Sequence, residues 1–539
     1  MRRVKKAVAL ALSCAMLSGC GGSSKRDTST FRFALAADIT SMDSTVVDDT
    51  VSFDAIHAVT EGLMGLDKDG NTTNAIAKDY KVSADKKTYT FTLRDDAKWS
   101  NGDPVTANDF VYAWKRIIKN AGTYGYMFGS DGANIKNADQ LILKGTNATD
   151  AELNTLGVKA VNDKTLTVEL NAPVPFFADL MSFPCFYPIN EKFAEKAGKK
   201  YATAPQYTLS NGAFVMTKWT KGKSADFEKN DDYYNKGVVK IKKLHMDLGI
   251  KPQSASANFD AKKIDYAEIS TDLVDKYKNS KSFVDYNDGG LGYLEVNHKN
   301  KDLANLNIRK AISLAINRKS LCNDILKNGS TPANGFVPKG LSKAPNGKDF
   351  REVAGSYTDY NLKEAQAAFD QGLKELGKTN ITLGLLYGSD ENSSDKMAEY
   401  LETNLSKLKG LKIEMKATTF KDKIGNRMPQ GNFDLVITAW GPDFEDPTTF
   451  LNLMNKGNSS NYGKYDNSKY ISLMKNIQTE SNVEKRYNYM LEAEKVAMED
   501  YANIPLIDRG GSALQAEYVK GLIHKPVGVA YTFTYVDLN

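Results

Sequence analysis

Segments with helical periodicity alternate with strand-like segments along this chain, and that alternation most constrains its fold. Segments 381–386 and 433–440 are largely apolar, as strands covered on both faces of a sheet are. Segment 411–416 lies between them and is a further predicted strand. Helical periodicity precedes these segments in 362–376 and follows them in 483–498. This order predicts an α/β fold whose sheets are partly parallel.

The N-terminal quarter of the chain shows the same two patterns. Tyr89, Phe91 and Leu93 alternate with polar residues, which predicts a half-buried strand. Thr106 precedes Asp109 by three residues, the spacing of a capping box at the start of a helix. The apolar residues that follow share one helical face: Phe110, Val111, Trp114, Ile117 and Ile118.

The N-terminus carries the features of an export signal. Basic residues precede an apolar run of 11 residues, 7–17, whereas a helix that spans a bilayer needs about 20. The run therefore predicts a secretory signal peptide. Leu-Ser-Gly-Cys at 17–20 resembles the bacterial lipobox, in which the cysteine thiol carries the lipid through a thioether. An ordinary secretory signal with a chance cysteine is the alternative.

On this interpretation, residues 1–19 are the lipoprotein signal peptide and Cys20 is the lipidated residue. The small and polar residues 20–30 form a flexible tether. We expect the protein to be extracytoplasmic and lipid-anchored to the cell membrane. About 520 residues remain after cleavage, and domains of roughly 100–200 residues predict two or three lobes.

Charge argues against nucleic acid as a partner. The whole chain carries +5, and four basic residues leave with the signal, so the mature charge is about +1. Phosphate binding needs a concentrated basic face, and the lysines are scattered along the chain.

The cysteines predict neither a disulfide framework nor a metal site. Cys14 leaves with the signal and Cys20 is committed to lipid. Cys185 and Cys322 stand 137 residues apart; they could pair, but we expect two buried free thiols. Their spacing does not suit a metal, whose Cys and His ligands are closely spaced. We expect no metal and no cofactor.

Two further segments match ligand-binding motifs in part of their sequence but lack the structural context or the ligands that binding needs. Residues 372–379 match the Walker A pattern, but a helix precedes the loop and a strand follows it, which reverses the order that phosphate binding needs. Gly377 is better explained as a helix C-cap. Residues 67–71 resemble a calcium loop, yet its twelfth position is Lys78 rather than glutamate, and we expect a hairpin turn.

No catalytic motif is present in the sequence. None of the four histidines belongs to a His-Glu-x-x-His motif, and Gly-x-Ser-x-Gly does not occur. Paired carboxylates of the glycosidase type are still conceivable among 66 acidic residues. We expect no enzyme and no catalytic residue, and a secreted hydrolase is the rival hypothesis.

Five segments spread over nearly the whole mature chain carry a family pattern. The most specific is Trp-Ser-Asn-Gly-Asp-Pro-Val-Thr-Ala-Asn-Asp-Phe, which begins at Trp99. The five are 36–43, 99–114, 210–214 with 230–234, 293–297 with 308–318, and 431–451. In this order they resemble the oligopeptide-binding lipoproteins of bacterial ABC importers, the peptide and nickel branch of extracellular solute-binding proteins.

The resemblance implies a two-lobed, periplasmic-binding-protein-like fold of type II with hinge strands and an additional inserted α/β subdomain. The implied parts are lobe one (31–65, 205–297 and 509–539), the inserted subdomain (66–204) and lobe two (298–508). A ligand would lie between the lobes, and closure would bury it.

The resemblance also implies the binding residues. A binder of many peptides should grip the backbone, as an added strand does, and should offer a carboxylate to the α-ammonium group. Asp443 matches the family's amine-binding aspartate, three residues past Trp440; a turn aspartate before Pro447 is the alternative. Trp440 is expected to line the cleft. The other peptide-binding candidates are Gly441, Asn297, Tyr293, Asp38 and Tyr126.

Two departures from the family pattern bear on the ligand. Enteric relatives place an arginine three residues before the tryptophan, where this chain has Ile437, and a half-cystine just after it, where this chain has Gly441. The first puts capture of a peptide C-terminus in doubt, unless Arg427 takes its place. The second removes a crosslink near the hinge.

We therefore expect a monomeric, lipid-anchored receptor that binds peptides and delivers them to an ABC permease. A narrower ligand is the alternative within binding proteins: a dipeptide, a murein tripeptide, a peptide pheromone or a nickel chelate.

Overall fold

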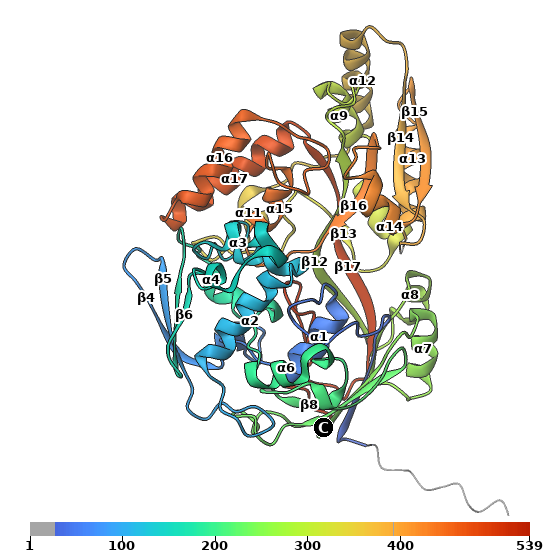
Figure 1. Ribbon diagram of the computed structural model, residues 1–539. Helices are drawn as coiled ribbons and strands as arrows, with labels where there is room; N and C mark the ends of the chain where they lie inside the picture. Colours follow the sequence, from blue (N-terminus) through green and yellow to red (C-terminus); the bar gives the residue numbers. More distant parts are fainter. Residues whose placement is uncertain (1–26, 392) are drawn as a thin grey trace, which may run out of the picture.

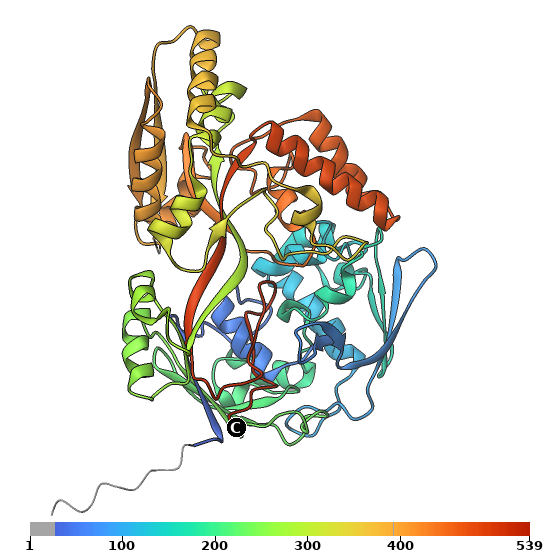
Figure 2. The ribbon, with the colours of Figure 1, turned by 180° about the vertical axis from the view of Figure 1, so that it is seen from behind.

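The computed structural model of the 539-residue chain describes residues 27–391 and 393–539. The predicted signal peptide and Cys20 lie outside the described residues. Two long strands, β12 (Phe283–Val296) and β17 (Asn503–Gln515), pair antiparallel and run between the two halves of the molecule (Figures 1 and 2).

These two strands are the middle of an 11-stranded sheet that extends into both halves. The order is β15-β14-β16-β12-β17-β11-β1-β10-β9-β8, with β13 paired to β17. Beyond β12, β14 (Ile381–Gly388) runs parallel to β15 (Leu411–Thr418) and β16 (Leu435–Trp440). On the other side β1 runs parallel to β10 and β11. The partly parallel α/β sheet is thus as predicted.

The remaining strands of this sheet lie in the half that holds the chain's C-terminus, apart from β13. They are β1 (Thr30–Ala34), β8 (Phe214–Thr220), β9 (Ser224–Lys229), β10 (Lys243–Asp247), β11 (Tyr266–Glu268) and β13 (Thr331–Pro332). Two hairpins stand apart: β2 (Met64–Leu66) with β3 (Thr72–Asn74), and β18 (Ile523–His524) with β19 (Tyr531–Thr532).

A second, antiparallel sheet is built in the order β4-β5-β7-β6. Tyr89, Phe91 and Leu93 are its buried face on β5, which confirms the predicted half-buried strand. The capping box of Thr106 and Asp109 begins helix α2 (Ala107–Lys119), as predicted. The strands are β4 (Ala77–Val82), β5 (Thr88–Leu93), β6 (Val158–Asn162) and β7 (Thr165–Glu169).

The helices cover both sheets. The longer ones are α1 (Thr50–Val59), α3 (Ala138–Lys144), α6 (Glu191–Ala197), α7 (Pro252–Asp260), α8 (Thr271–Tyr277), α9 (Leu306–Leu314), α12 (Leu362–Leu376), α13 (Ser394–Leu405), α16 (Ser468–Thr479) and α17 (Val483–Glu499). The short ones are α4 (Asp150–Leu153), α5 (Phe177–Leu180), α10 (Arg318–Ser320), α11 (Phe350–Ala354), α14 (Phe420–Asp422) and α15 (Thr448–Leu451).

Both loops that imitate ligand motifs have the structural roles predicted for them. Helix α12 ends in Gly377, whose φ of +66° places it in the left-handed region, and strand β14 follows. The turn between β2 and β3 is organised by Asp67, whose carboxylate accepts the N–H groups of Asp69 and Asn71 at 2.9 Å each.

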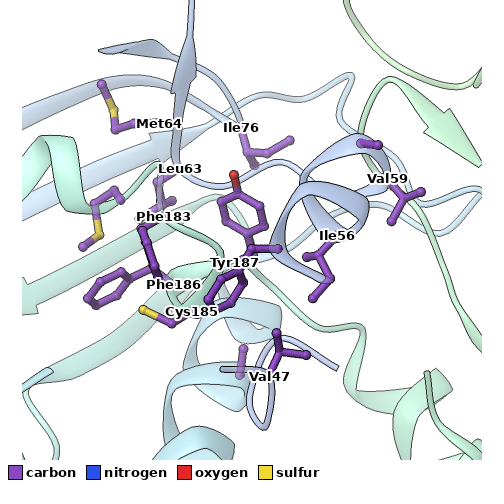
Figure 3. Packing of buried hydrophobic residues seen from close by; sticks show 14 of the residues in the cluster. Val47, Ile56, Val59, Leu63, Met64, Ile76, Phe183, Cys185, Phe186 and Tyr187 are labelled. Atoms are coloured by element: carbon purple, nitrogen blue, oxygen red, sulfur yellow. The ribbon is translucent and has the colours of Figure 1, made fainter. Parts of the chain in front are cut away.

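The apolar interior is divided in a way that follows the two halves. The largest buried cluster combines residues of 31–266 with Phe444 and the C-terminal 513–538, and Figure 3 shows a part of it around Phe183, Cys185 and Tyr187. Two further clusters lie where β12 and β17 enter the other half. Cys185 and Cys322 are buried free thiols, as expected.

Within the described part of the chain, no helix has the length and apolar character needed to cross a membrane. The same residues contain no group of three or more His, Cys, Asp or Glu side chains that could hold a metal ion.

Candidate functional site

Five parts of the chain meet around a small cavity beyond the end of β16. Its walls come from α1, from the β2–β3 hairpin, from α5 and the residues after it, from the segment after β16 and from the C-terminal segment. The volume is about 30 Å³, enough for one or two water molecules. The polar residues that line it are His57, Thr72, Asp179, Ser182, Asp443, Glu445 and Lys525.

Asp443 and Asp179 are the half-buried carboxylates of this cavity. Asp443 Oδ2 accepts a hydrogen bond from the Tyr126 hydroxyl at 2.5 Å, and the N–H of Asp443 donates to Thr449 Oγ1 at 3.1 Å. Burial raises the pKa of Asp443 to about 6, and the Tyr126 hydrogen bond partly offsets that rise. Burial and the neighbouring carboxylate hold the pKa of Tyr126 well above its usual value, so it stays a donor.

The neighbours of Asp443 in sequence are neutralised, whereas Asp443 is not. Glu445 pairs with Lys525 at 2.6 Å, and Asp446 pairs with Arg486 at 2.7 Å. Among the residues that the structure describes, no cation forms an ion pair with Asp443. A carboxylate with a single side-chain donor is suited to a cationic ligand, because the positive charge of the ligand would offset the free-energy cost of burying the carboxylate.

Tyr126 comes from the 3-10 helix η1 (Thr123–Phe128), more than 300 residues before Asp443. The sequence suggested it only by position. Trp440 and Gly441 lie just before Asp443, at the end of β16. Trp440 is half-buried, and its indole Nε1 has no hydrogen-bond partner among the described residues. Gly441 is exposed, with no atom near the position of a Cβ.

The other three candidates lie away from this carboxylate. The carboxylate of Asp38 accepts the N–H groups of Gly222 at 2.7 Å and Ile39 at 2.9 Å. Tyr293 is buried in an apolar cluster, with its ring 5.1 Å from that of Phe336.

Asn297 also has backbone partners of its own. Its amide donates to the carbonyl oxygens of Gly431 at 3.2 Å and Phe433 at 2.8 Å. It lines a separate cavity of about 410 Å³ together with Arg427.

The structure does not bring Arg427 to Ile437. Arg427 pairs with Asp422 at 3.1 Å, whereas Ile437 and Ala439 line another cavity of about 250 Å³ beside β17. Arg427 is not among the residues of that cavity.

Two cations that the sequence analysis missed lie close to Ile437. Lys423 donates to the Ile437 carbonyl at 3.1 Å and pairs with Glu391. Arg509 lines the cavity of about 250 Å³ and pairs with Asp288 at 2.8 Å. No local pattern marks either residue, because each reaches its place only through folding.

His57 and Lys525 were also missed at the Asp443 cavity. His57 contacts the hydroxyls of Tyr187 at 2.5 Å and Thr532 at 3.0 Å. Burial lowers the pKa of His57 to about 4, so its ring is neutral at pH 7 and adds no positive charge beside Asp443.

Comparison with known families decides what kind of protein carries this site. Residues 71–462 match the model of the bacterial extracellular solute-binding proteins, family 5. The chain belongs to this family. Family 5 proteins bind solutes and are not enzymes, so the rival hypothesis of a secreted hydrolase is wrong.

Relatives of this family 5 protein match it over nearly the full length. It is 34% identical to the dipeptide-binding protein of Lactococcus lactis, covering 97% of this chain and 96% of the relative. It is 32% identical to the oligopeptide-binding protein OppA of Bacillus subtilis, covering 96% of each. The peptide-bound structure of Listeria monocytogenes OppA is similar, with a TM-score of 0.78, 37% identity and coverage of 95% of this chain and 100% of that one. The expected binding-protein fold is thereby confirmed.

The contact between Tyr126 and Asp443 predicts a measurable change in acidity. In the Tyr126→Phe variant of this family 5 protein, the carboxylate loses its side-chain donor, so the pKa of Asp443 should rise above about 6. Carboxyl carbon NMR during a pH titration measures it. Tyr124→Phe is the matched control, since Tyr124 stands beside Tyr126 with ring centroids 6.1 Å apart. An unchanged Asp443 titration in Tyr126→Phe would contradict the assigned hydrogen bond.

Proposed function

We propose that this protein binds peptides between its two lobes, holds their α-ammonium group at Asp443, and delivers them as a monomer to an ABC permease. The observation that carries the proposal is the missing cation. Glu445 and Asp446 each have a basic partner, whereas Asp443 keeps a half-buried carboxylate with one hydroxyl donor. The names of its relatives, a dipeptide-binding and an oligopeptide-binding protein, support the same ligand class.

The main chain of the peptide would lie along the end of β16. Ala439 and Gly441 are exposed there, and an extended peptide beside them can add a strand whose side chains point to alternate sides. Trp440 would then line the cleft as an aromatic wall. Asp38, Asn297 and Tyr293 stay predicted peptide-binding residues, at positions away from Asp443.

The lobes of the proposal keep the predicted boundaries. Lobe one comprises 31–65, 205–297 and 509–539, the inserted subdomain 66–204, and lobe two 298–508. The separate apolar clusters support this division, and β12 and β17 would serve as the hinge.

Short peptides are the second candidate ligand class. The cavity beside Asp443 measures only about 30 Å³, and the relative at 34% identity is named a dipeptide-binding protein. A murein tripeptide or a peptide pheromone also has an amine for Asp443, whereas a nickel chelate would leave that carboxylate without a partner.

Removal of the Asp443 charge should weaken binding strongly. Loss of one partner of a buried ion pair costs about 3–5 kcal/mol, or roughly a 10²–10³-fold loss of affinity. We expect that loss for trialanine with the isosteric Asp443→Asn variant, and a similar loss for N-acetyl-trialanine with the unaltered protein. Calorimetry that finds equal affinities for free and acetylated peptide would refute the amine site.

The same carboxylate predicts the pH dependence of that binding. The pKa of Asp443 is about 6, and a protonated carboxyl must lose its proton before it can pair with an ammonium group. Affinity should therefore fall up to about tenfold per pH unit below pH 6. Asp443→Asn should lack this dependence.

A free peptide C-terminus should matter little. Lys423 and Arg509, the cations near Ile437, are already paired with Glu391 and Asp288. Amidation should therefore change affinity by less than about 1 kcal/mol, the scale of an exposed ion pair. Calorimetry with matched acid and amide peptides of three to eight residues measures this. A loss above tenfold would show that one of these cations leaves its partner for the peptide.

The receptor would be anchored through Cys20. Two acyl chains, each gaining about 0.8 kcal/mol per buried methylene, hold a protein firmly on a membrane. Cys20→Ala should abolish labelling by a palmitate analogue and should release the protein or leave it as an unlipidated precursor. Undiminished label on the variant would rule out this anchor, and Cys185→Ala is the control that should keep the label.

A further inference from the structure

The four residues that begin with Asp443 contact four separate segments of the chain. We call residues 443–446 the docking segment. Asp443 contacts Tyr126, Phe444 stacks on Phe176, Glu445 pairs with Lys525, and Asp446 pairs with Arg486. The first three partners belong to the inserted subdomain or to the C-terminal part of lobe one, and Figure 1 shows α15, just after the docking segment, close to α3 of the inserted subdomain.

Phe444 is the most buried residue of the docking segment. It is 4% exposed and belongs to the large buried cluster of lobe one and the inserted subdomain, although its chain neighbours belong to lobe two. Its ring lies parallel to that of Phe176, with centroids 4.6 Å apart and 6° between the planes. Such a stack adds to the stability gained from burial alone.

Arg486 binds the last residue of the docking segment. Both of its terminal nitrogens donate to Asp446, at 2.7 and 3.0 Å. Its guanidinium also lies 5.9 Å from the ring of Phe176, within the range of a cation–π contact. One lobe-two arginine therefore restrains the docking segment and touches the ring on which Phe444 stacks.

Contacts between the lobes on the other side of the hinge strands are weaker. There Lys396 of α13 pairs with Asp272 of α8 at 2.8 Å, and their side chains are 42% and 73% exposed. Exposed pairs of this kind contribute little. The docking segment, by contrast, places the buried side chain of Phe444 in the large cluster of lobe one and the inserted subdomain.

We propose that Phe176 and Phe444 are positioning residues for peptide binding, and that their stack holds Asp443 against Tyr126 when the lobes close. This inference rests on the proposed amine site. Phe444 follows Asp443 directly, so displacement of its ring moves the carboxylate. Loss of the stack would favour the open state, from which a peptide escapes, and would act mainly on the dissociation rate.

The test compares Phe444→Ala and Phe176→Ala with the unaltered protein. Stopped-flow measurements with trialanine should show dissociation faster by about tenfold, with an association rate changed by less than about threefold. The double variant should lose little more than either single variant, because each removes the same stack. Small-angle scattering of the peptide-free variants should show a larger radius of gyration. Unchanged dissociation and scattering would overturn the proposal.

One control variant and one substitute variant complete the test of the stack. Phe420→Ala removes a 46% exposed phenylalanine of lobe two and should leave rates and scattering unchanged. Phe444→Leu keeps an apolar side chain and serves if Phe444→Ala does not fold; faster dissociation in it supports the stack, and rates equal to those of the unaltered protein count against it.

The failure of the proposed function would look different from the failure of this inference. If the unaltered protein binds free and acetylated trialanine equally, the amine site is wrong. The scattering of the phenylalanine variants still decides whether their stack holds the lobes together. Asp443→Asn should weaken trialanine binding without enlarging the peptide-free protein.

Discussion

The pairing of β12 with β17 is the constraint on which the rest of the structure depends. These strands are antiparallel neighbours from Phe283 opposite Leu514 to Glu295 opposite Asn503. Every other connection of the large sheet is built outward from them. The register shifts after Asn287 and again between Gly292 and Tyr293, and such irregularities bend a strand and increase its twist. The ladder can therefore bend locally while its ends keep their partners.

A close backbone approach accompanies the first irregularity. Gly289 has a φ of +72°, and a Cβ at this position would lie 2.5 Å from the carbonyl oxygen of Pro526. Only glycine adopts this conformation at low cost and leaves room for the C-terminal segment. That segment carries Lys525 to Glu445, beside Asp443. The irregular part of the hinge strands thus also decides where one wall of the site lies.

Several of the charges around the end of β16 are paired. Lys423 is matched by Glu391, Arg509 by Asp288, and Arg486 by Asp446. Burial of a charge is expensive unless it is paired, and this applies to Lys423 and to the pair of Arg486 with Asp446, whereas the side chain of Arg509 is 41% exposed. Asp443 forms no ion pair with a cation among the described residues, so the free-energy cost of burying its charge appears as a raised pKa. A ligand amine at Asp443, as proposed above, would reduce that cost.

The local elements and the family can be read from the order of the residues alone. Period-two alternation placed β5, the capping box placed the start of α2, and Gly377 was identified as a helix end, because each depends on neighbouring residues. The docking segment also lay within a recognisable motif. Three contacts follow from the folded arrangement instead: the hydrogen bond of Asp443 with Tyr126, the approach of Lys423 rather than Arg427 to Ile437, and the place of Phe444 in the largest buried cluster. These contacts join residues from 14 to more than 300 positions apart in the chain. Such residues come together only when β12 and β17 pair and the apolar side chains are buried.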